Sequence, residues 1–556
     1  MPQHAWLFSL VIGVISSIGL SAGLSGAESS FTLEEATIAE IQEAVGAGAL
    51  SSEKLVELYL ARIAAYDRAG PRLNSIIYIN PNATAEAAAL DKERAEKGPR
   101  GPLHGIPILL KDNVDVANMP TTNGSAIMKD AIPPEDGSIT KALRAAGAVI
   151  LGKAAMGEFA GGSYNSVRGQ TLNPYNVKRN TGGSSSGSGA AISANFAVLA
   201  IGTDTSTSVR GPAAYTGIVG MRPTTGLISR AGVAPKNLNF DSAGPMARTV
   251  TDLALMMNVL AFPDPKDPKS VEVWGEFEKL DPTAKSGVDF TKALDKDALK
   301  GRKLGVLRDL FEGDPEITAL AEKAIATMKE LGATIVDIRL DPAFIEAHLR
   351  AGIRKTRDLS DYRFRQDWEQ YLATFKNPKL PKTVAEFVNI YETEIAQSPL
   401  PVEDSVMNLL KTSLKTSTAA PEYKNFIENQ MPRATAEKLA VFEKHGVDAL
   451  VFPYVPTFAQ PIKNPIYAID DPAFVKSEAP VPATMAGYSS VGFPSIVVPM
   501  GFGSQGLPMT ITFFGKPYEE RKILGFAYAY EQASKMRKPS PLVPPLKGET
   551  INYATK

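Results

Sequence analysis

The sequence predicts an α/β fold with a large mixed, mostly parallel sheet that is flanked by helices. Short apolar runs bounded by Gly and Pro recur along the chain, as is typical of buried strands, and segments at helical spacing separate several of them. Strands spaced by helices form a parallel or mixed sheet with helices packed against it. A charged and aromatic stretch, residues 342–438, is interrupted by prolines and predicts a mainly helical insertion or cover.

The elements follow in order from residue 28, where we expect the folded domain, residues 28–556, to begin. Thr32 to Glu35 fits a capping box, and Ser52 begins an amphipathic helix that continues to Ala64. The run 105–113 predicts a buried strand with Lys111 near its end. We expect the other strands at 74–80, 148–151, 303–307, 333–338, 449–452, 495–499 and 509–514, a helix at 81–97, and an extended Pro-rich tail at 539–547.

Residues 1–27 have the shape of a signal peptide. They contain no Lys, Arg, Asp or Glu, and the apolar run from Trp6 to Leu24 is followed by the small residues Ser25, Gly26 and Ala27. We therefore expect cleavage after Ala27 and export to the periplasm or the medium. An uncleaved anchor is the alternative, because about 20 apolar residues can span a bilayer. A membrane is an expected partner only in that case.

Composition excludes several classes of function. The formal net charge is −1, from 59 basic and 60 acidic residues, so a nucleic-acid groove is not expected and the substrate should be small and roughly neutral. Because the chain has no cysteine, disulfides, thiolate nucleophiles and Cys-based metal sites are excluded. With four histidines and no paired His spacing, we expect neither a metal nor a cofactor.

Residues 180–212 carry the densest run of Gly and Ser. Such a loop can turn backbone N–H groups toward a ligand, and apolar segments that must pack surround it, which argues against a flexible linker. Two motifs compete within it. Residues 183–187 satisfy G-x-S-x-G, but the downstream histidines, His348 and His445, resemble ordinary surface or helix-end residues. Residues 187–189 resemble the start of a dinucleotide loop, but Ile192 replaces the small residue that this loop requires.

Lys111 is the candidate base for a serine nucleophile, because histidines are scarce. A lysine acts as a base only when neutral, and lowering its pKa from about 10.4 to about 7 corresponds to about 4 to 5 kcal/mol. Burial can cause a shift of this size. A lone lysine is more often a surface residue whose charge stays in water, so the prediction depends on the Gly/Ser segment.

The chain resembles the amidase-signature family over nearly its whole length after the leader, and within it is most similar to bacterial peptide amidases. The resemblance rests on motifs in a fixed order: Gly105 to Asn113, Gly182 to Ser185, Gly202 to Asp204, Ser208 to Arg210, Gly217 to Gly220, Arg222 to Thr224, Asp241 to Ala247 and Gly492 to Pro494.

This resemblance implies a Ser-Ser-Lys triad. Lys111 would be the base, Ser184 the bridging serine in a cis peptide with Gly183, and Ser208 the nucleophile that forms an acyl-enzyme. The implied oxyanion hole consists of the backbone N–H groups of Thr205, Ser206, Thr207 and Ser208. The implied supporting residues are Ser185, Asp204 and Arg210, the last two as a buried ion pair.

The chain departs from the family at three positions. The family usually has two glycines where Ser206 and Thr207 stand, and commonly has Asn at the position of Ser489. A Cβ restricts the backbone, most of all at β-branched Thr207, so these two side chains limit the conformations that the implied oxyanion hole can adopt.

The expected function is hydrolysis of a peptide C-terminal amide or another small amide. The same machinery would serve aryl amides, carbamates or esters. Two competing hypotheses are a non-catalytic binding protein of the same fold and a transamidating subunit that acts on aminoacyl-tRNA.

Overall fold

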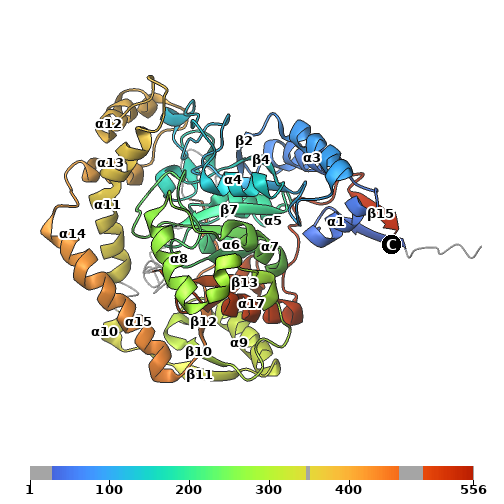
Figure 1. Ribbon diagram of the computed structural model, residues 1–556. Helices are drawn as coiled ribbons and strands as arrows, with labels where there is room; N and C mark the ends of the chain where they lie inside the picture. The colour runs from blue at the N-terminus through green and yellow to red at the C-terminus, as the bar shows by residue number, and fades with distance from the viewer. Residues whose placement is uncertain (1–27, 346–350, 463–491, 555–556) are drawn as a thin grey trace, which may run out of the picture.

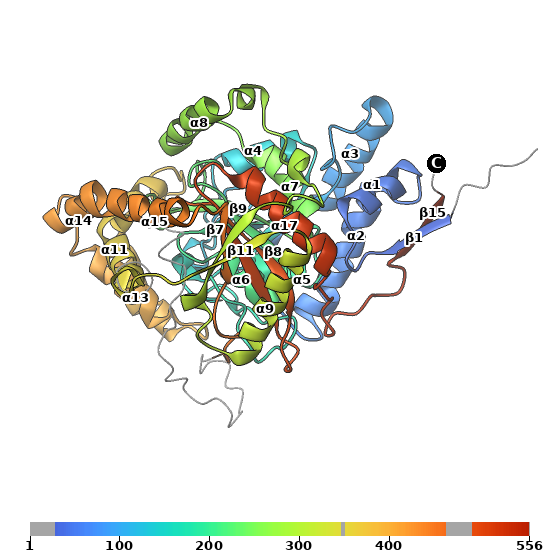
Figure 2. The same cartoon turned by 90° about the horizontal axis from the view of Figure 1, so that it is seen from below.

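The computed structural model describes residues 28–345, 351–462 and 492–554 (Figure 1). One large sheet lies at the centre, with helices on both of its faces, and the helical insertion lies along one side of the molecule (Figures 1 and 2). Near the two ends of the described chain, β1 (Glu28–Thr32) pairs antiparallel with β15 (Thr550–Ala554). The expected signal peptide, His348 and Ser489 lie outside the described residues.

The central sheet is mixed. Its strands, in spatial order, are β11 (Thr334–Ile338), β10 (Lys303–Leu307), β12 (Ala449–Pro453), β14 (Pro508–Phe514), β13 (Ser495–Phe502), β8 (Val219–Arg222), β9 (Ser242–Ala247), β7 (Leu199–Asp204), β3 (Pro107–Lys111), β4 (Val149–Ala154) and β2 (Ile76–Ile79). Pairing is parallel within β11-β10-β12 and within β7-β3-β4, and antiparallel at the other junctions. The predicted mixed α/β sheet is confirmed, although antiparallel pairs outnumber the expected parallel ones among the described strands.

Three strands that the sequence pattern did not predict, β7, β8 and β9, occupy the middle of the sheet. Gly and Pro within β8 and β9 are poor local signals for a strand. β8 and β9 form strands because each has a neighbouring strand on both sides. Glycine permits the two strands to approach closely, since a Cβ on Gly244 in β9 would lie 2.0 Å from the Met221 carbonyl oxygen in β8. Tertiary packing therefore overrides local preference here.

Helices cover the sheet on both faces. They are α1 (Ile38–Gly46), α2 (Ser52–Arg62), α3 (Ala83–Lys97), α4 (Ser138–Ala145), α5 (Ser186–Ser193), α6 (Arg210–Thr216), α7 (Val250–Leu260), α8 (Pro268–Leu280), α9 (Pro315–Glu330) and α17 (Glu520–Ser534). The capping box expected at Thr32 is wrong, because Thr32 ends strand β1. The capping box lies five residues later, where the Thr37 hydroxyl accepts the Glu40 N–H and the Glu40 carboxylate accepts the Thr37 N–H.

The insertion is helical, as predicted. Its helices are α10 (Pro342–Phe344), α11 (Ala351–Leu372), α12 (Val384–Thr393), α13 (Asp404–Ser413), α14 (Pro421–Asn425) and α15 (Met431–His445). It docks on the core through an apolar cluster in which Phe159, from the segment after β4, packs against Phe364, Trp368, Phe387 and Tyr391. Among the helices that the structure describes, none combines the length and apolar character needed to cross a membrane.

Candidate active site

Lys111 is the last residue of β3 and is completely buried. Its Nζ lies 2.8 Å from Ser184 Oγ, 2.7 Å from Thr203 Oγ1 and 3.2 Å from the Thr203 carbonyl oxygen. β3 pairs parallel with β7, which brings the ends of both strands, and with them Lys111 and Thr203, to the same edge of the sheet. The ammonium is therefore withdrawn from water and held against a hydroxyl that could give up a proton.

The pKa of Lys111 is lowered from 10.5 to about 7. Burial is the main cause, and Lys236 lowers the pKa further, while the carboxylates of Asp204 and Asp241 oppose the shift. A substantial fraction of the lysine is therefore neutral near pH 7. This is the state in which an amine can act as a general base.

Ser184 lies in a loop between β6 (Gly169–Gln170) and α5, and its peptide bond with Gly183 is cis, as the resemblance implied. The Gly157 N–H donates to the Ser184 carbonyl oxygen (3.0 Å). Gly183 has no room for a side chain, because a Cβ there would lie 1.8 Å from the Gly162 carbonyl oxygen. The close contact between these two loop segments thus requires glycine.

Ser208 follows β7 and precedes α6, and it is 7% exposed. The Ser185 N–H donates to its carbonyl oxygen (3.2 Å), and the Ser185 hydroxyl lies 3.2 Å from both the N and the O of Thr203. Ser185 therefore holds the Ser184 and Ser208 segments together at the end of β7. In the described residues no hydrogen bond joins the Ser184 and Ser208 hydroxyls, so the structure links Lys111 directly to Ser184, and Ser208 to this pair only through the backbone.

The loop from Thr205 to Ser208 adopts no left-handed backbone conformation. Ser206 and Thr207 therefore carry a Cβ without backbone strain, although the family usually has glycine at both positions. The Thr207 carbonyl oxygen accepts the Gly211 N–H (2.7 Å), and the Thr205 hydroxyl donates to Asp241 Oδ1 (2.6 Å). Within the described chain the N–H groups of Thr207 and Ser208 donate to no protein acceptor, which leaves them available for a substrate oxygen.

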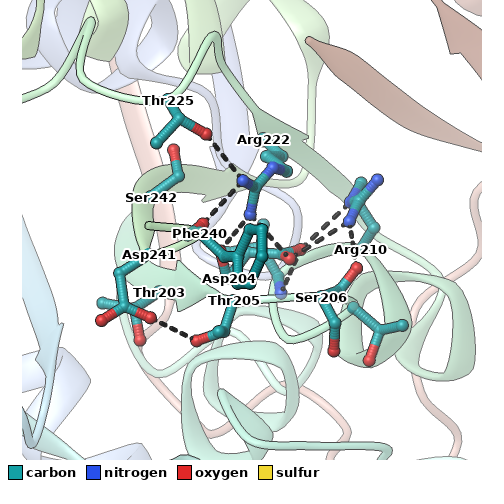
Figure 3. A network of polar contacts seen from close by, with 12 residues as sticks. Thr203, Asp204, Thr205, Ser206, Arg210, Arg222, Thr225, Phe240, Asp241 and Ser242 are labelled. Carbon is teal, nitrogen blue, oxygen red and sulfur yellow. Dashed lines mark hydrogen bonds and ion pairs between the residues drawn. The ribbon is translucent and has the colours of Figure 1, made fainter. Parts of the chain in front are cut away.

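Asp204 is completely buried and is the centre of a network of polar contacts (Figure 3). Arg210 contacts both carboxylate oxygens, at 3.0 and 3.1 Å, and also donates to the Ser206 carbonyl oxygen (2.6 Å). Arg222 contacts both the side chain and the carbonyl oxygen of Asp204. The ion pair expected between Asp204 and Arg210 is thus present, and it includes a second arginine.

The charges of this network explain its pKa shifts. Burial alone would raise the pKa of Asp204, but the two guanidinium groups outweigh it and lower the pKa to about 2. Burial lowers the pKa of Arg222 to about 10 despite the neighbouring carboxylate. The network therefore stays ionised near neutral pH and fixes the loop that carries Ser208.

Sequence reasoning missed three residues of the site, namely Thr203, Arg222 and Asp241. Each lies in a motif on which the resemblance rests, which was the available signal. Their roles depend on partners on other strands, since Arg222 on β8 contacts Asp204 at the end of β7, and Asp241, just before β9, accepts the hydroxyl of Thr205, just after β7 (Figure 3).

A small hollow adjoins Thr203. Asp241, whose carboxylate also accepts the N–H groups of Lys236 and Asn237 (both 2.8 Å), forms one side of it. The hollow is lined by Asn113, Ala160, Thr203, Thr205, Arg230, Val233, Ala234, Lys236, Asp241, Ser242 and Ala243.

The competing motifs find no support. Gly187 lies inside α5, where a Cβ would be 2.3 Å from Ala155 N, so this glycine serves close packing rather than a dinucleotide. Ser185 precedes α5 without the strand that a nucleophile elbow needs, and His445 ends α15 in the insertion. No group of three or more His, Asp or Glu side chains in the described residues is arranged to hold a metal ion.

Comparisons with known proteins agree with this architecture. The family model described as Amidase matches residues 54–524. The peptide amidase of Stenotrophomonas maltophilia superposes with a TM-score of 0.79 at 34% identity, covering 92% of this chain and 99% of that one. An amidase family protein from Bacillus anthracis gives a TM-score of 0.78 at 33% identity, covering 91% and 92%.

One similar protein is named as an amidotransferase subunit rather than as an amidase. The A subunit of the glutamyl-tRNA(Gln) amidotransferase from Geobacter metallireducens is 34% identical over 516 residues, which cover 90% of this chain and 98% of that one. The family match, which spans most of the sequence, and the shared fold lead to one conclusion: the chain belongs to the amidase family.

Proposed function

We propose that the protein is a serine amidohydrolase in which Ser208 attacks an amide carbonyl and Ser184 and Lys111 move the proton. The observation that carries the proposal is the buried Lys111, with its Nζ 2.8 Å from Ser184 Oγ and its pKa lowered to about 7. A buried lysine that contacts a serine hydroxyl can act as a base near neutral pH, whereas a charged surface lysine cannot.

In this mechanism neutral Lys111 accepts the Ser184 proton while Ser184 accepts that of Ser208. The Ser208 oxygen bonds to the carbonyl carbon, and the N–H groups of the 205–208 loop stabilise the oxyanion. The relay then reverses, the departing amine takes the proton, and the C–N bond breaks to leave an acyl-enzyme. Water, deprotonated through the same relay, attacks the ester, and the acid leaves as Ser208 regains its proton.

The proposed substrate is a peptide C-terminal amide or another small, roughly neutral amide. Similarity to a peptide amidase over 92% of the chain supports this class, as does the formal net charge of −1. Aryl amides, carbamates and esters are substrates that the same mechanism could also cleave. A binding protein without catalysis is disfavoured, because the Lys111–Ser184 contact is intact.

A transamidating subunit is the second candidate function, and 34% identity to the A subunit of an amidotransferase favours it. The two differ in what they need: the amidohydrolase acts alone, whereas a subunit that passes ammonia to a second substrate depends on its partner. We further propose that residues 1–27 direct export to the periplasm or the medium.

Ammonia release from a panel of C-terminally amidated peptides tests the function, with the chain from Glu28 assayed beside its Ser208→Ala variant. Release by the parent alone supports the amidohydrolase. Release by both proteins would contradict Ser208 as the nucleophile. Release by neither protein would indicate aryl amides, carbamates or esters as the substrates. Failure to cleave any of these would indicate a partner-dependent subunit or a binding protein.

A further inference from the structure

Two buried tyrosines of the insertion donate hydrogen bonds to carboxyl groups of the core. Tyr391, on α12, donates to Glu158 Oε1, and Tyr371, on α11, donates to Asp115 Oδ1 (2.7 Å). All four side chains are at most 8% exposed. Each bond therefore joins the insertion to the core where water cannot replace the lost partner, and leaving such a group unpaired is costly.

The bond between Tyr391 and Glu158 belongs to a network with complementary donors. Glu158 Oε1 accepts the Ser166 hydroxyl (2.7 Å) and Oε2 accepts the Ser166 N–H (3.1 Å), while the Tyr391 oxygen lies 2.5 Å from Ser125 Oγ. Burial raises the pKa of Glu158 to about 7, although the hydrogen bonds from Tyr391 and Ser166 oppose the shift. Directional bonds from several elements thus fix the position of this carboxyl group.

Glu158 lies between two backbone bonds that lead to the catalytic segments. On one side the Gly157 N–H donates to the Ser184 carbonyl oxygen (3.0 Å). On the other the Phe159 N–H donates to the Asn123 carbonyl oxygen (3.0 Å), and the Asn123 N–H donates to the carbonyl oxygen of Asp112 (3.1 Å), the residue after Lys111. A displacement of Glu158 would therefore shift both the Ser184 segment and the end of β3.

Packing reinforces the same segment. A Cβ on Gly157 would lie 2.0 Å from the Gly161 carbonyl oxygen, so the segment is folded tightly on itself. Phe159 has a φ of 47°, which non-glycine residues adopt rarely, and insertion rings surround its side chain, with the Trp368 centroid 5.0 Å away. The insertion thus holds the segment by side-chain packing as well as by the Tyr391 hydroxyl.

We propose that Tyr391, acting through Glu158, is a positioning residue for Ser184, so that the docked insertion sets the contact between Ser184 and Lys111. Tyr371 makes the second bond of this kind, to Asp115, which lies four residues after Lys111 in the chain. The proposal rests on the proposed function and adds to it. The insertion is then part of the catalytic architecture, in addition to any wall that it provides for the substrate.

The test compares Tyr391→Phe with Tyr362→Phe in the full chain, by kcat and KM for a C-terminally amidated peptide and by thermal unfolding. Tyr362 is the control for loss of a tyrosine hydroxyl, because it donates to Glu422 within the insertion (2.9 Å) in a bond that is exposed to solvent. Since misplacement by about 1 Å can cost about 100-fold in rate, we expect Tyr391→Phe to lower kcat by about 10- to 100-fold and to change KM by less than about twofold.

The positioning role is overturned if Tyr391→Phe and Tyr362→Phe have the same kcat, if only KM changes, or if the activity lost equals the fraction of protein unfolded at the assay temperature. Ser208→Ala distinguishes failure of the proposed function from failure of the positioning role. An active Ser208→Ala enzyme contradicts the proposed function itself, whereas an inactive one beside a fully active Tyr391→Phe enzyme contradicts the positioning role alone.

Discussion

Acidification should switch the enzyme off by protonating Lys111. Its pKa falls from 10.5 to about 7, mainly through burial, a difference of about 5 kcal/mol between its two protonation states. With a pKa near 7, about 1% of this lysine is neutral at about pH 5, about half at about pH 7 and about 99% at about pH 9. The value of kcat/KM should therefore rise about tenfold per unit below about pH 6.5 and level off above about pH 8.

The assay is the initial rate of ammonia release from an amidated peptide between about pH 5 and about pH 9, with the enzyme returned to neutral pH afterwards to show that it survived. In the proposed relay Lys111, Ser184 and Ser208 exchange protons, so the midpoint would belong to the three residues together. A flat profile, or a rise that continues without levelling as an ordinary lysine would give, would refute the reasoning.

The same shift predicts how stability depends on pH. Because the folded pKa of Lys111 is the lower one, the unfolded chain binds more protons between about pH 7 and the unfolded pKa of 10.5. This lysine therefore makes stability rise with pH across that window, by at most about 1.4 kcal/mol per unit, and adds no slope below it. Lys111→Met should be inactive and should lack this part of the slope in urea unfolding, and parallel curves for parent and variant would contradict the shift.

Three further predictions address the surroundings of the lysine. Asp204→Ala leaves two buried arginines without their carboxylate and should lower the free energy of unfolding by about 3 to 5 kcal/mol. The control Lys279→Ala breaks an exposed ion pair and should change the free energy of unfolding by less than about 1 kcal/mol. Equal effects of the two variants in urea unfolding would contradict the stabilising role of the network. Lys236→Met removes a positive charge that lowers the Lys111 pKa, so the midpoint of the pH profile should move upward, and an unchanged or lower midpoint would count against this influence. Activity should be unaffected by EDTA, and a loss that a divalent ion restores would disprove the expected absence of a metal.

The α/β class, the helical insertion and the family followed from the sequence, because they depend on signals that are local or ordered along the chain. The run that contains Lys111 is apolar and bounded by Gly and Pro, and it forms strand β3 as predicted. Where local signals were weak or ambiguous the predictions failed: the capping box lies at Thr37 rather than Thr32, and strands β8 and β9 contain glycine and proline that only neighbouring strands can accommodate.

The motifs also identified Lys111, Ser184 and Ser208 as a set of candidate catalytic residues, and their catalytic roles stay a prediction. Only the tertiary structure decided how they meet. The contact between Lys111 and Ser184 joins residues 73 positions apart, and burial, which no local pattern measures, sets the lysine pKa. The second arginine of the Asp204 network and the Tyr391–Glu158 bond likewise join distant segments. A linear pattern can supply the groups for proton transfer, but their distances and their exclusion from water arise only when the whole chain packs.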